Sequence, residues 1–90
     1  DIYVLRDELG VYAMASRCTH VGCLLPCPVD DLMLCPCHGS RFNANGDLLS
    51  GVAAADLDHF AVSFECIDDE VKIYVDASQA LLDRQTRTPV

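Results

Sequence analysis

Two short segments that combine cysteine with histidine constrain this chain more than any other feature of its sequence. Residues 18–23 read CTHVGC and residues 35–40 read CPCHGS. Each segment places thiolate sulfur and imidazole nitrogen within three residues, a spacing typical of metal ligands. A chain of 90 residues usually needs a cross-link, such as a bound metal or a disulfide, to support its small apolar core. The two segments predict where that cross-link lies.

Strand-forming residues flank these segments on both sides. Alternation over residues 2–16, interrupted by a turn at Gly10, predicts one hairpin. Alternation over residues 60–75, interrupted by an acidic turn at 68–70, predicts a second hairpin. The sequence therefore indicates base strands at about 2–16 and 60–75, with loops at about 17–42 inserted between them.

Three further elements follow from local signals. The apolar run at residues 32–34 favours a short strand between the two cysteine segments. The pair at residues 45–46, Asn-Gly, predicts a two-residue hairpin turn between Phe42 and Leu48. Residues 78–85 predict a short C-terminal helix with a polar N-cap. The expected fold class is all-β and antiparallel, with this one helix.

Composition excludes several classes of protein. Fourteen Asp and Glu against six Lys and Arg give a net charge of −8, which excludes a nucleic-acid partner because phosphate binding needs clustered basic side chains. A hydrophobic content of 51% excludes a disordered chain. No apolar run reaches the roughly 18 residues of a transmembrane helix, so we expect no transmembrane segment within this chain.

The residues alone do not decide which kind of cross-link the two segments form. One hypothesis is a zinc site made of two cysteines and two histidines, one of each from either segment. That hypothesis leaves Cys23 and Cys37 without a role. Another hypothesis pairs all six cysteines in disulfides, which leaves the two histidines unexplained.

Taken together, the two segments resemble those of the Rieske iron–sulfur proteins, in which two histidines replace two cysteines on one iron. Both segments have the form found in the disulfide-containing Rieske subunits of cytochrome bc family quinol oxidoreductases. The resemblance extends more loosely over residues 10–76, and it implies that residues 1–90 form one small antiparallel Rieske domain. It implies one 2Fe–2S cluster with Cys18 and Cys35 on one iron, His20 and His38 on the other, and a loop-tying disulfide between Cys23 and Cys37.

The resemblance also implies what tunes the cluster. Ser40 stands where the family's serine donates its hydroxyl to a cluster sulfide. Phe42 stands where high-potential members have a tyrosine that donates to a ligand cysteine, so we expect a lower potential here. Residues 51–54 correspond to the family's proline-containing loop over the cluster but contain no proline. Val21 replaces the leucine that most quinol-oxidising members place at the docking surface.

The function implied by the resemblance is one-electron transfer as the iron–sulfur subunit of a quinol–cytochrome c oxidoreductase, with His20 and His38 facing the electron donor. The chain is then an electron-transfer subunit, not an enzyme by itself. The expected partners are quinol or membrane complex subunits and a c-type cytochrome or similar redox protein. The alternatives are a subunit of another oxidoreductase, such as arsenite oxidase, and a standalone Rieske electron carrier.

Location and completeness follow from the same resemblance. Disulfides persist in oxidising compartments, so we expect the periplasmic or other extracytoplasmic side of an energy-conserving membrane. We expect anchoring through a segment outside this sequence. Family members usually carry further strand sequence before the equivalent of Ile2, so the domain is expected to be shortened at its N-terminus.

Some residues remain outside this assignment. Cys27 and Cys66 are either buried free thiols or a second disulfide, and the spacing does not decide between them. His59 lies beside Phe60 at the start of a predicted strand, and we expect it to be an ordinary polar residue. The acidic pair at residues 30–31 is expected to form a loop face on which a basic cytochrome could dock.

Overall fold

The computed structural model describes residues 1–89, and all of their regular structure consists of β-strands joined by turns and loops. Every strand pair is antiparallel, which confirms the fold class expected from the sequence. Within residues 1–89 there is no helix long and apolar enough to cross a membrane. The strands are β1 (Ile2–Asp7), β2 (Gly10–Ala15), β3 (Met33–Leu34), β4 (Arg41–Phe42), β5 (Leu48–Ser50), β6 (His59–Ile67) and β7 (Glu70–Asp76).

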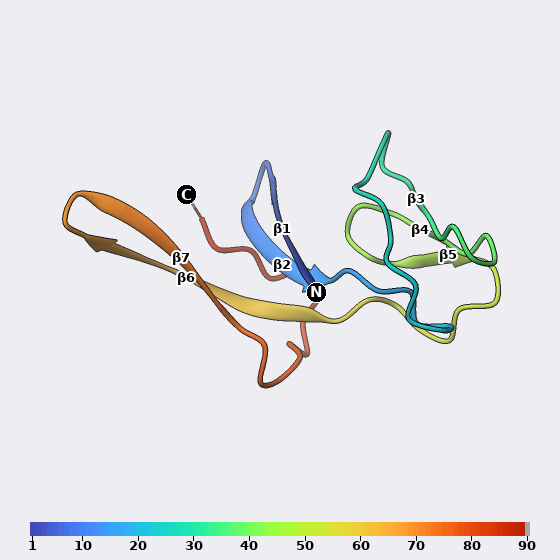
Figure 1. Cartoon of the computed structure of the whole chain (residues 1–90). Coiled ribbons are helices and arrows are strands. Elements are labelled where there is room, and N and C mark those ends of the chain that lie inside the picture. Colours follow the sequence, from blue (N-terminus) through green and yellow to red (C-terminus); the bar gives the residue numbers. More distant parts are fainter. Residues whose placement is uncertain (90) are drawn as a thin grey trace.

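The strands form two sheets that occupy opposite halves of the molecule (Figure 1). One sheet has four strands in the order β1-β2-β6-β7, and the other has three strands in the order β3-β4-β5. The three-stranded sheet and the loops around it lie between β2 and β6 in the chain. Strands of the four-stranded sheet thus come both before and after this inserted part of the chain.

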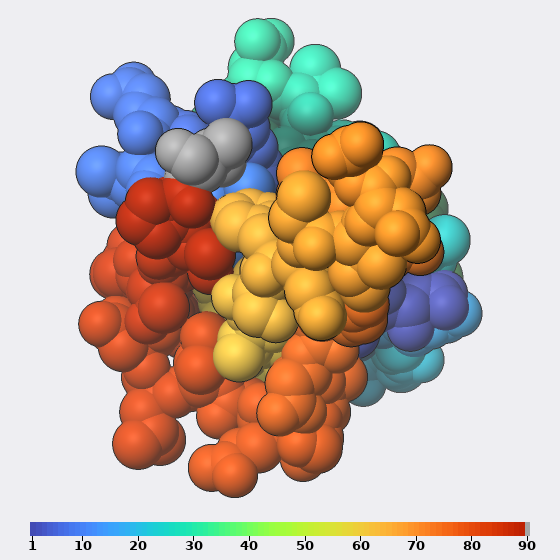
Figure 2. Space-filling model, turned by 90° about the vertical axis from the view of Figure 1, so that its left-hand side faces the viewer, coloured from blue at the N-terminus to red at the C-terminus, as the bar shows by residue number. Residues whose placement is uncertain are grey.

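The first hairpin pairs β1 with β2 in a register that runs from Ile2 opposite Ala15 to Asp7 opposite Gly10. Gly10 has a φ of 136°, and a Cβ atom there would lie 2.4 Å from the backbone oxygen of Thr88. The C-terminal segment therefore crosses this turn closely, and Thr88 forms an antiparallel bridge with Val11. Figure 2 shows the same segment, in red, packed beside the gold strand β6.

The second hairpin pairs β6 with β7 and extends away from the three-stranded sheet (Figure 1). Its two turn residues, Asp68 and Asp69, both have positive φ values, 52° and 63°, as a type I′ turn requires. The register places Phe64 opposite Ile73, so apolar side chains of both strands share one face. The alternation in the sequence predicted this hairpin correctly.

Side chains from both sheets form one buried core. Met14 of β2, Met33 of β3 and Phe42 of β4 are fully buried and belong to one cluster with Leu25 and Leu57 from the connecting segments. Burial of each such side chain contributes about 1.5–3 kcal/mol. The same cluster includes two loop cysteines, so the apolar core continues into the cysteine-bearing loops.

The expected C-terminal helix at residues 78–85 is wrong. Its capping contact does form, because Asp76 Oδ1 accepts hydrogen bonds from the Ser78 N–H at 3.0 Å and the Ser78 hydroxyl at 2.6 Å. The segment nevertheless continues as turns and bends, and the Leu81 N–H donates to the His59 carbonyl of β6 at 2.8 Å. A helix this short is marginal by itself, so contacts with the sheet decide its conformation.

The expected two-residue turn at residues 45–46 is also wrong, because the connection between β4 and β5 spans residues 43–47. The Asn43 side chain organises it, since its Oδ1 accepts from the N–H groups of Asn45 at 3.0 Å and Asp47 at 2.9 Å. These bonds replace the direct strand pairing that a two-residue turn requires.

Candidate metal centre

The two cysteine segments fold into loops with the same backbone hydrogen bonds. In residues 18–23 and in residues 35–40, the N–H of the first cysteine donates to the carbonyl five residues later at 2.8 Å. The N–H four residues later donates back to that cysteine's carbonyl at 3.0 Å. The residue that donates this second bond, the fifth of each segment, is Gly22 in one loop and Gly39 in the other, with φ values of 78° and 77°. A Cβ atom would meet nothing within 4 Å at either position, so glycine is favoured by its backbone conformation alone.

A disulfide joins the two loops. Cys23 and Cys37 are bonded, with Cα atoms 6.5 Å apart and a sequence separation of 14 residues. The structure thus contains the pairing that the family resemblance implied. Because a cross-link limits the freedom of the unfolded chain, it favours the geometry in which both loops face each other.

The two remaining loop cysteines form a buried thiol pair. Cys18 and Cys35 are free thiols, each 2% exposed, and each influences the pKa of the other. Burial raises the pKa of Cys18. Burial also acts to raise the pKa of Cys35, but backbone N–H groups of Cys37 and His38 outweigh it and lower that pKa.

The two loop histidines form a second, exposed pair. The rings of His20 and His38 lie edge to face with their centroids 4.9 Å apart, and both residues are exposed. Among residues 1–89, no three side chains of His, Cys, Asp or Glu gather closely enough to hold one metal ion. The four donors instead lie as one thiol pair and one imidazole pair. That division suits a binuclear centre with two protein ligands on each metal.

A third segment, residues 51–57, contacts both loops, and we call it the bridging segment. The Ala53 N–H donates to Ser40 Oγ at 3.0 Å, and Ser40 is fully buried, with a hydroxyl that acts to lower the pKa of Cys18 against the larger effect of burial. The Thr19 hydroxyl donates to the Ala55 carbonyl at 2.7 Å and accepts from the Ala55 N–H at 3.1 Å. The bridging segment is therefore hydrogen-bonded to both cysteine-bearing loops.

Close packing of this segment depends on Gly51. Its φ is 107°, and a Cβ atom there would lie 2.5 Å from the Cα of Ser40. The approach is possible without prolines in the segment, because hydrogen bonds from both loops hold it. Phe42 lies beneath the loops, fully buried between Met33 and Leu48, its register partners in β3 and β5. Phe42 is therefore a packed core residue.

The leftover residues depart from what the sequence indicated. Cys27 and Cys66 are free, as one hypothesis held, but both are exposed and not buried, and the alternative second disulfide is absent from the described residues. His59 is not an ordinary polar residue, because it is fully buried and stacks on Tyr12 with ring centroids 5.5 Å apart. Its Nε2 lies 2.6 Å from the Asn45 carbonyl, and burial lowers its pKa. Nothing in the local sequence signals this long-range contact.

Comparison with known proteins decides the family. The family model of the Rieske [2Fe–2S] domain matches residues 1–61. The chain belongs to the Rieske [2Fe–2S] domain family. That domain carries a 2Fe–2S cluster, and the paired thiols and paired imidazoles fit the mixed ligation of such a cluster.

Individual Rieske proteins support the same family. The chain is 41% identical over 59 residues to the cytochrome b6-f complex iron-sulfur subunit of Synechococcus sp. strain JA-2-3B'a(2-13), covering 62% of this chain and 34% of the relative. It is 38% identical over 66 residues to the chloroplastic subunit of Arabidopsis thaliana, covering 72% of this chain and 28% of the relative. The chain thus corresponds to about a third of the length of these relatives.

A solved structure shares the fold. The crystal structure of the plasma membrane Rieske protein PetC3 from Synechocystis PCC 6803 superposes with a TM-score of 0.59 at 27% identity. The superposition covers 81% of this chain and 73% of that protein. The arrangement of the two sheets is therefore one that a known Rieske protein adopts.

Proposed function

We propose that this Rieske domain transfers single electrons through one 2Fe–2S cluster. Cys18 and Cys35 hold one iron, and His20 and His38 hold the other. The observation that carries this proposal is the division of the donors into a buried thiol pair and an exposed imidazole pair. The boundaries follow, with cluster loops at about 17–42 within a single domain of residues 1–90.

The surrounding residues perform distinct tasks. A bound cluster supplies a one-electron redox centre, and histidine ligation raises its potential relative to ligation by cysteine alone. Burial of Cys18 and Cys35 excludes water from the sulfur side of the site. The exposed rings of His20 and His38 present the opposite side to an electron donor, while the Ser40 hydroxyl stabilises negative charge on sulfur.

The partners are proposed from the named relatives, which are subunits of the cytochrome b6-f complex. We propose electrons from quinol or from subunits of a membrane complex, and an acceptor such as a c-type cytochrome. The net charge of −8 favours a basic acceptor surface, because opposite charges steer association. Membrane association on the extracytoplasmic side is supported by the disulfide, which persists in oxidising compartments.

A second candidate is a Rieske subunit of another oxidoreductase, such as arsenite oxidase. Phe42 has no hydroxyl to donate to a ligand sulfur, and residues 51–57 contain no proline. Both features favour a donor other than a high-potential quinol system. Reduction by a quinol analogue, competed with a quinone-site inhibitor, distinguishes the two candidates.

The cofactor proposal is tested by composition. The purified protein is expected to be coloured and to contain iron and acid-labile sulfide at about two each per chain. A colourless protein with one zinc per chain would overturn it. Substitution of Cys35 by serine should remove most of the bound iron, whereas the same change at the exposed thiol of Cys27 should not.

A further inference from the structure

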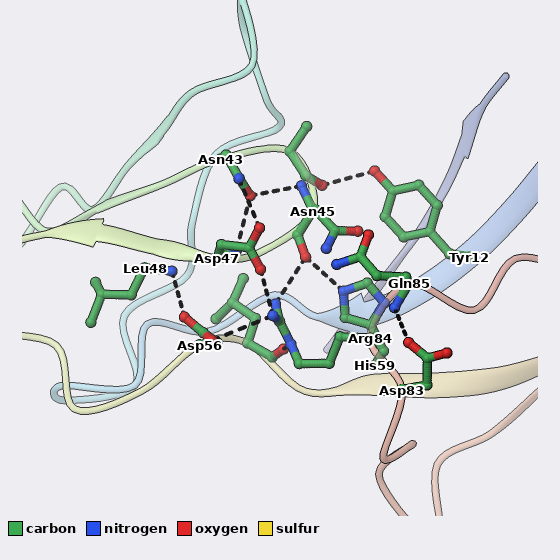
Figure 3. Close-up of polar contacts among 12 residues, drawn as sticks. Tyr12, Asn43, Asn45, Asp47, Leu48, Asp56, His59, Asp83, Arg84 and Gln85 are labelled. Atoms are coloured by element: carbon green, nitrogen blue, oxygen red, sulfur yellow. Dashed lines mark hydrogen bonds and ion pairs between the residues drawn. The ribbon is translucent and has the colours of Figure 1, made fainter. Parts of the chain in front are cut away.

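Arg84 lies in the C-terminal segment and binds four groups far from it in the chain (Figure 3). Its Nε donates to the Leu57 carbonyl at 2.9 Å, and its Nη2 donates to the Asn45 carbonyl at 3.0 Å. Its Nη1 binds the carboxylates of Asp47 and, at 3.4 Å, Asp56. The planar guanidinium thus fastens the β4–β5 connection and one end of the bridging segment to the C-terminal segment.

The opposite stretch of the bridging segment reaches the cluster loops. Ala55 exchanges two hydrogen bonds with the Thr19 side chain of the first loop. Ala53 donates to Ser40 of the second loop, whose hydroxyl also contacts Cys18. A single strip of seven residues therefore connects the Arg84 guanidinium to both loops that hold the proposed ligands.

The Arg84 contacts are shielded enough to matter energetically. Its side chain is 21% exposed, and the Asp47 side chain that it binds is 37% exposed. Burial acts to raise the pKa of Asp47, but hydrogen bonds from Arg84 and Asn43 lower it overall. Partly buried charge-assisted hydrogen bonds are stronger than exposed ones, because water screens them less.

We propose that Arg84 is a positioning residue for the cluster, acting through the bridging segment on Thr19 and Ser40. The guanidinium fixes Asp56 and Leu57, and the segment transmits that constraint to the two loops. This role rests on the proposed function, since it concerns the geometry in which the cluster is held. Arg84 lies beyond residues 1–61, the part of the chain that matches the Rieske family model.

Arg87 provides a matched control three residues further along the same segment. Its side chain is 8% exposed, its Nε pairs with the Asp7 carboxylate at 2.9 Å, and its guanidinium lies 3.7 Å from the centroid of the Tyr12 ring. It also binds the Asn45 side chain and, at 3.4 Å, the Arg84 carbonyl, but none of its hydrogen bonds to described residues reaches the bridging segment. Its removal should therefore cost stability without loosening that segment.

The test compares hydrogen exchange in the oxidised, cluster-loaded protein with Arg84→Ala, Arg84→Lys and Arg87→Ala. Peptides that cover the bridging segment should exchange about tenfold faster in Arg84→Ala than in the wild-type protein. In Arg87→Ala their exchange rate should stay at the wild-type value. Arg84→Lys keeps the positive charge but loses the planar set of guanidinium donors, so the exchange rate of the bridging segment should lie between those of the two alanine variants. The electron paramagnetic resonance signal of the reduced cluster should broaden in Arg84→Ala, broaden less in Arg84→Lys and stay unchanged in Arg87→Ala, because loss of the Arg84 contacts lets the ligand loops adopt a spread of orientations.

Equal exchange of the bridging segment in Arg84→Ala and Arg87→Ala, or an unbroadened signal in Arg84→Ala, would show a general stabilising role and overturn the proposal. Should Arg84→Ala not fold, Arg84→Lys against Arg87→Ala gives the same comparison. Absence of any cluster in the wild-type protein would contradict the proposed function. The exchange comparison on those same chains would still decide whether Arg84 holds the bridging segment.

Discussion

The two cluster loops share a backbone and differ in what their side chains deliver. Both close with the same pair of hydrogen bonds and the same left-handed glycine. The first loop carries its disulfide cysteine, Cys23, at the sixth position, where the second loop has Ser40. The second loop carries its disulfide cysteine, Cys37, at the third position, where the first has His20. The two loops therefore share one backbone conformation, which we call the common frame. They differ in the position from which each contributes its cysteine to the disulfide.

Removal of a loop histidine should have the largest effect. His20→Ala and His38→Ala should each lower bound iron at least about tenfold, because even outer contacts of a metal site are worth that much. The measurement is iron per chain after purification without oxygen. His59→Gln is the control, since that histidine binds the Asn45 carbonyl away from the loops. Full iron content in either loop variant would contradict the proposed ligand set.

Loss of the disulfide should follow in size. The double variant Cys23→Ser, Cys37→Ser should lose about 3 kcal/mol of unfolding free energy, as expected for a closed loop of about 15 residues. Urea denaturation of the cluster-free chain measures it. Cys27→Ser should change stability by less than about 0.5 kcal/mol, because that thiol is exposed and free. An equal loss of unfolding free energy in the double variant and in Cys27→Ser would show that the cross-link does not stabilise the loops.

The shared frame predicts equal responses at the two loop glycines. Gly22→Ala and Gly39→Ala should each cost about 1 kcal/mol, because both need left-handed φ and neither has a neighbour to clash with. Gly51→Ala should cost more, since its new Cβ would lie 2.5 Å from Ser40. Thermal unfolding of the three variants gives the comparison. Unequal costs at Gly22 and Gly39 would mean that the loops do not share one frame.

The hydroxyl at the sixth position of the second loop should tune the potential. Ser40→Ala should lower the midpoint potential by roughly 40 mV, the equivalent of one hydrogen bond of about 1 kcal/mol for a one-electron couple. Ser16→Ala is a matched control, because Ser16 is also fully buried and its Oγ has no hydrogen-bond partner among the described residues. Protein-film voltammetry measures both. Equal midpoint potentials in Ser40→Ala and Ser16→Ala would contradict the proposal that Ser40 tunes the potential.

The buried histidine, His59, should give the smallest effect, a pH dependence of the unfolding free energy below neutral pH. Burial, with the charges of Arg84 and Arg87 nearby, lowers the His59 pKa below the usual histidine value of about 6.5. The folded chain then binds fewer protons than the unfolded chain, so the unfolding free energy falls as pH drops below about 6.5. Urea unfolding at pH 7.5 and 5.5 measures the difference. In His59→Gln the drop between these pH values should be smaller, and an unchanged drop would assign it to other groups.

What the sequence predicted well is local. Alternation located both hairpins. The two cysteine segments located the loops that carry the thiol pair and the imidazole pair and, through the family resemblance, the Cys23–Cys37 pairing. These features depend on residues close together in the chain or on a specific motif. They therefore survive without knowledge of tertiary contacts.

What the sequence did not predict depends on partners far along the chain. Residues 78–85 are not helical because the Leu81 N–H bonds to β6. Burial of His59 requires Tyr12 and Asn45 to converge on it, and the role of Arg84 requires acceptors 27 to 39 residues away. No periodic pattern marks such contacts, so only the folded arrangement shows them.

Electron paramagnetic resonance of the dithionite-reduced protein addresses the ligand set itself. Two cysteines on one iron and two histidines on the other predict the spectrum of a mixed-ligand Rieske cluster, with resolved nitrogen couplings from two imidazoles in pulsed experiments. A spectrum of the all-cysteine type, without such nitrogen couplings, would contradict the assignment of His20 and His38 as ligands.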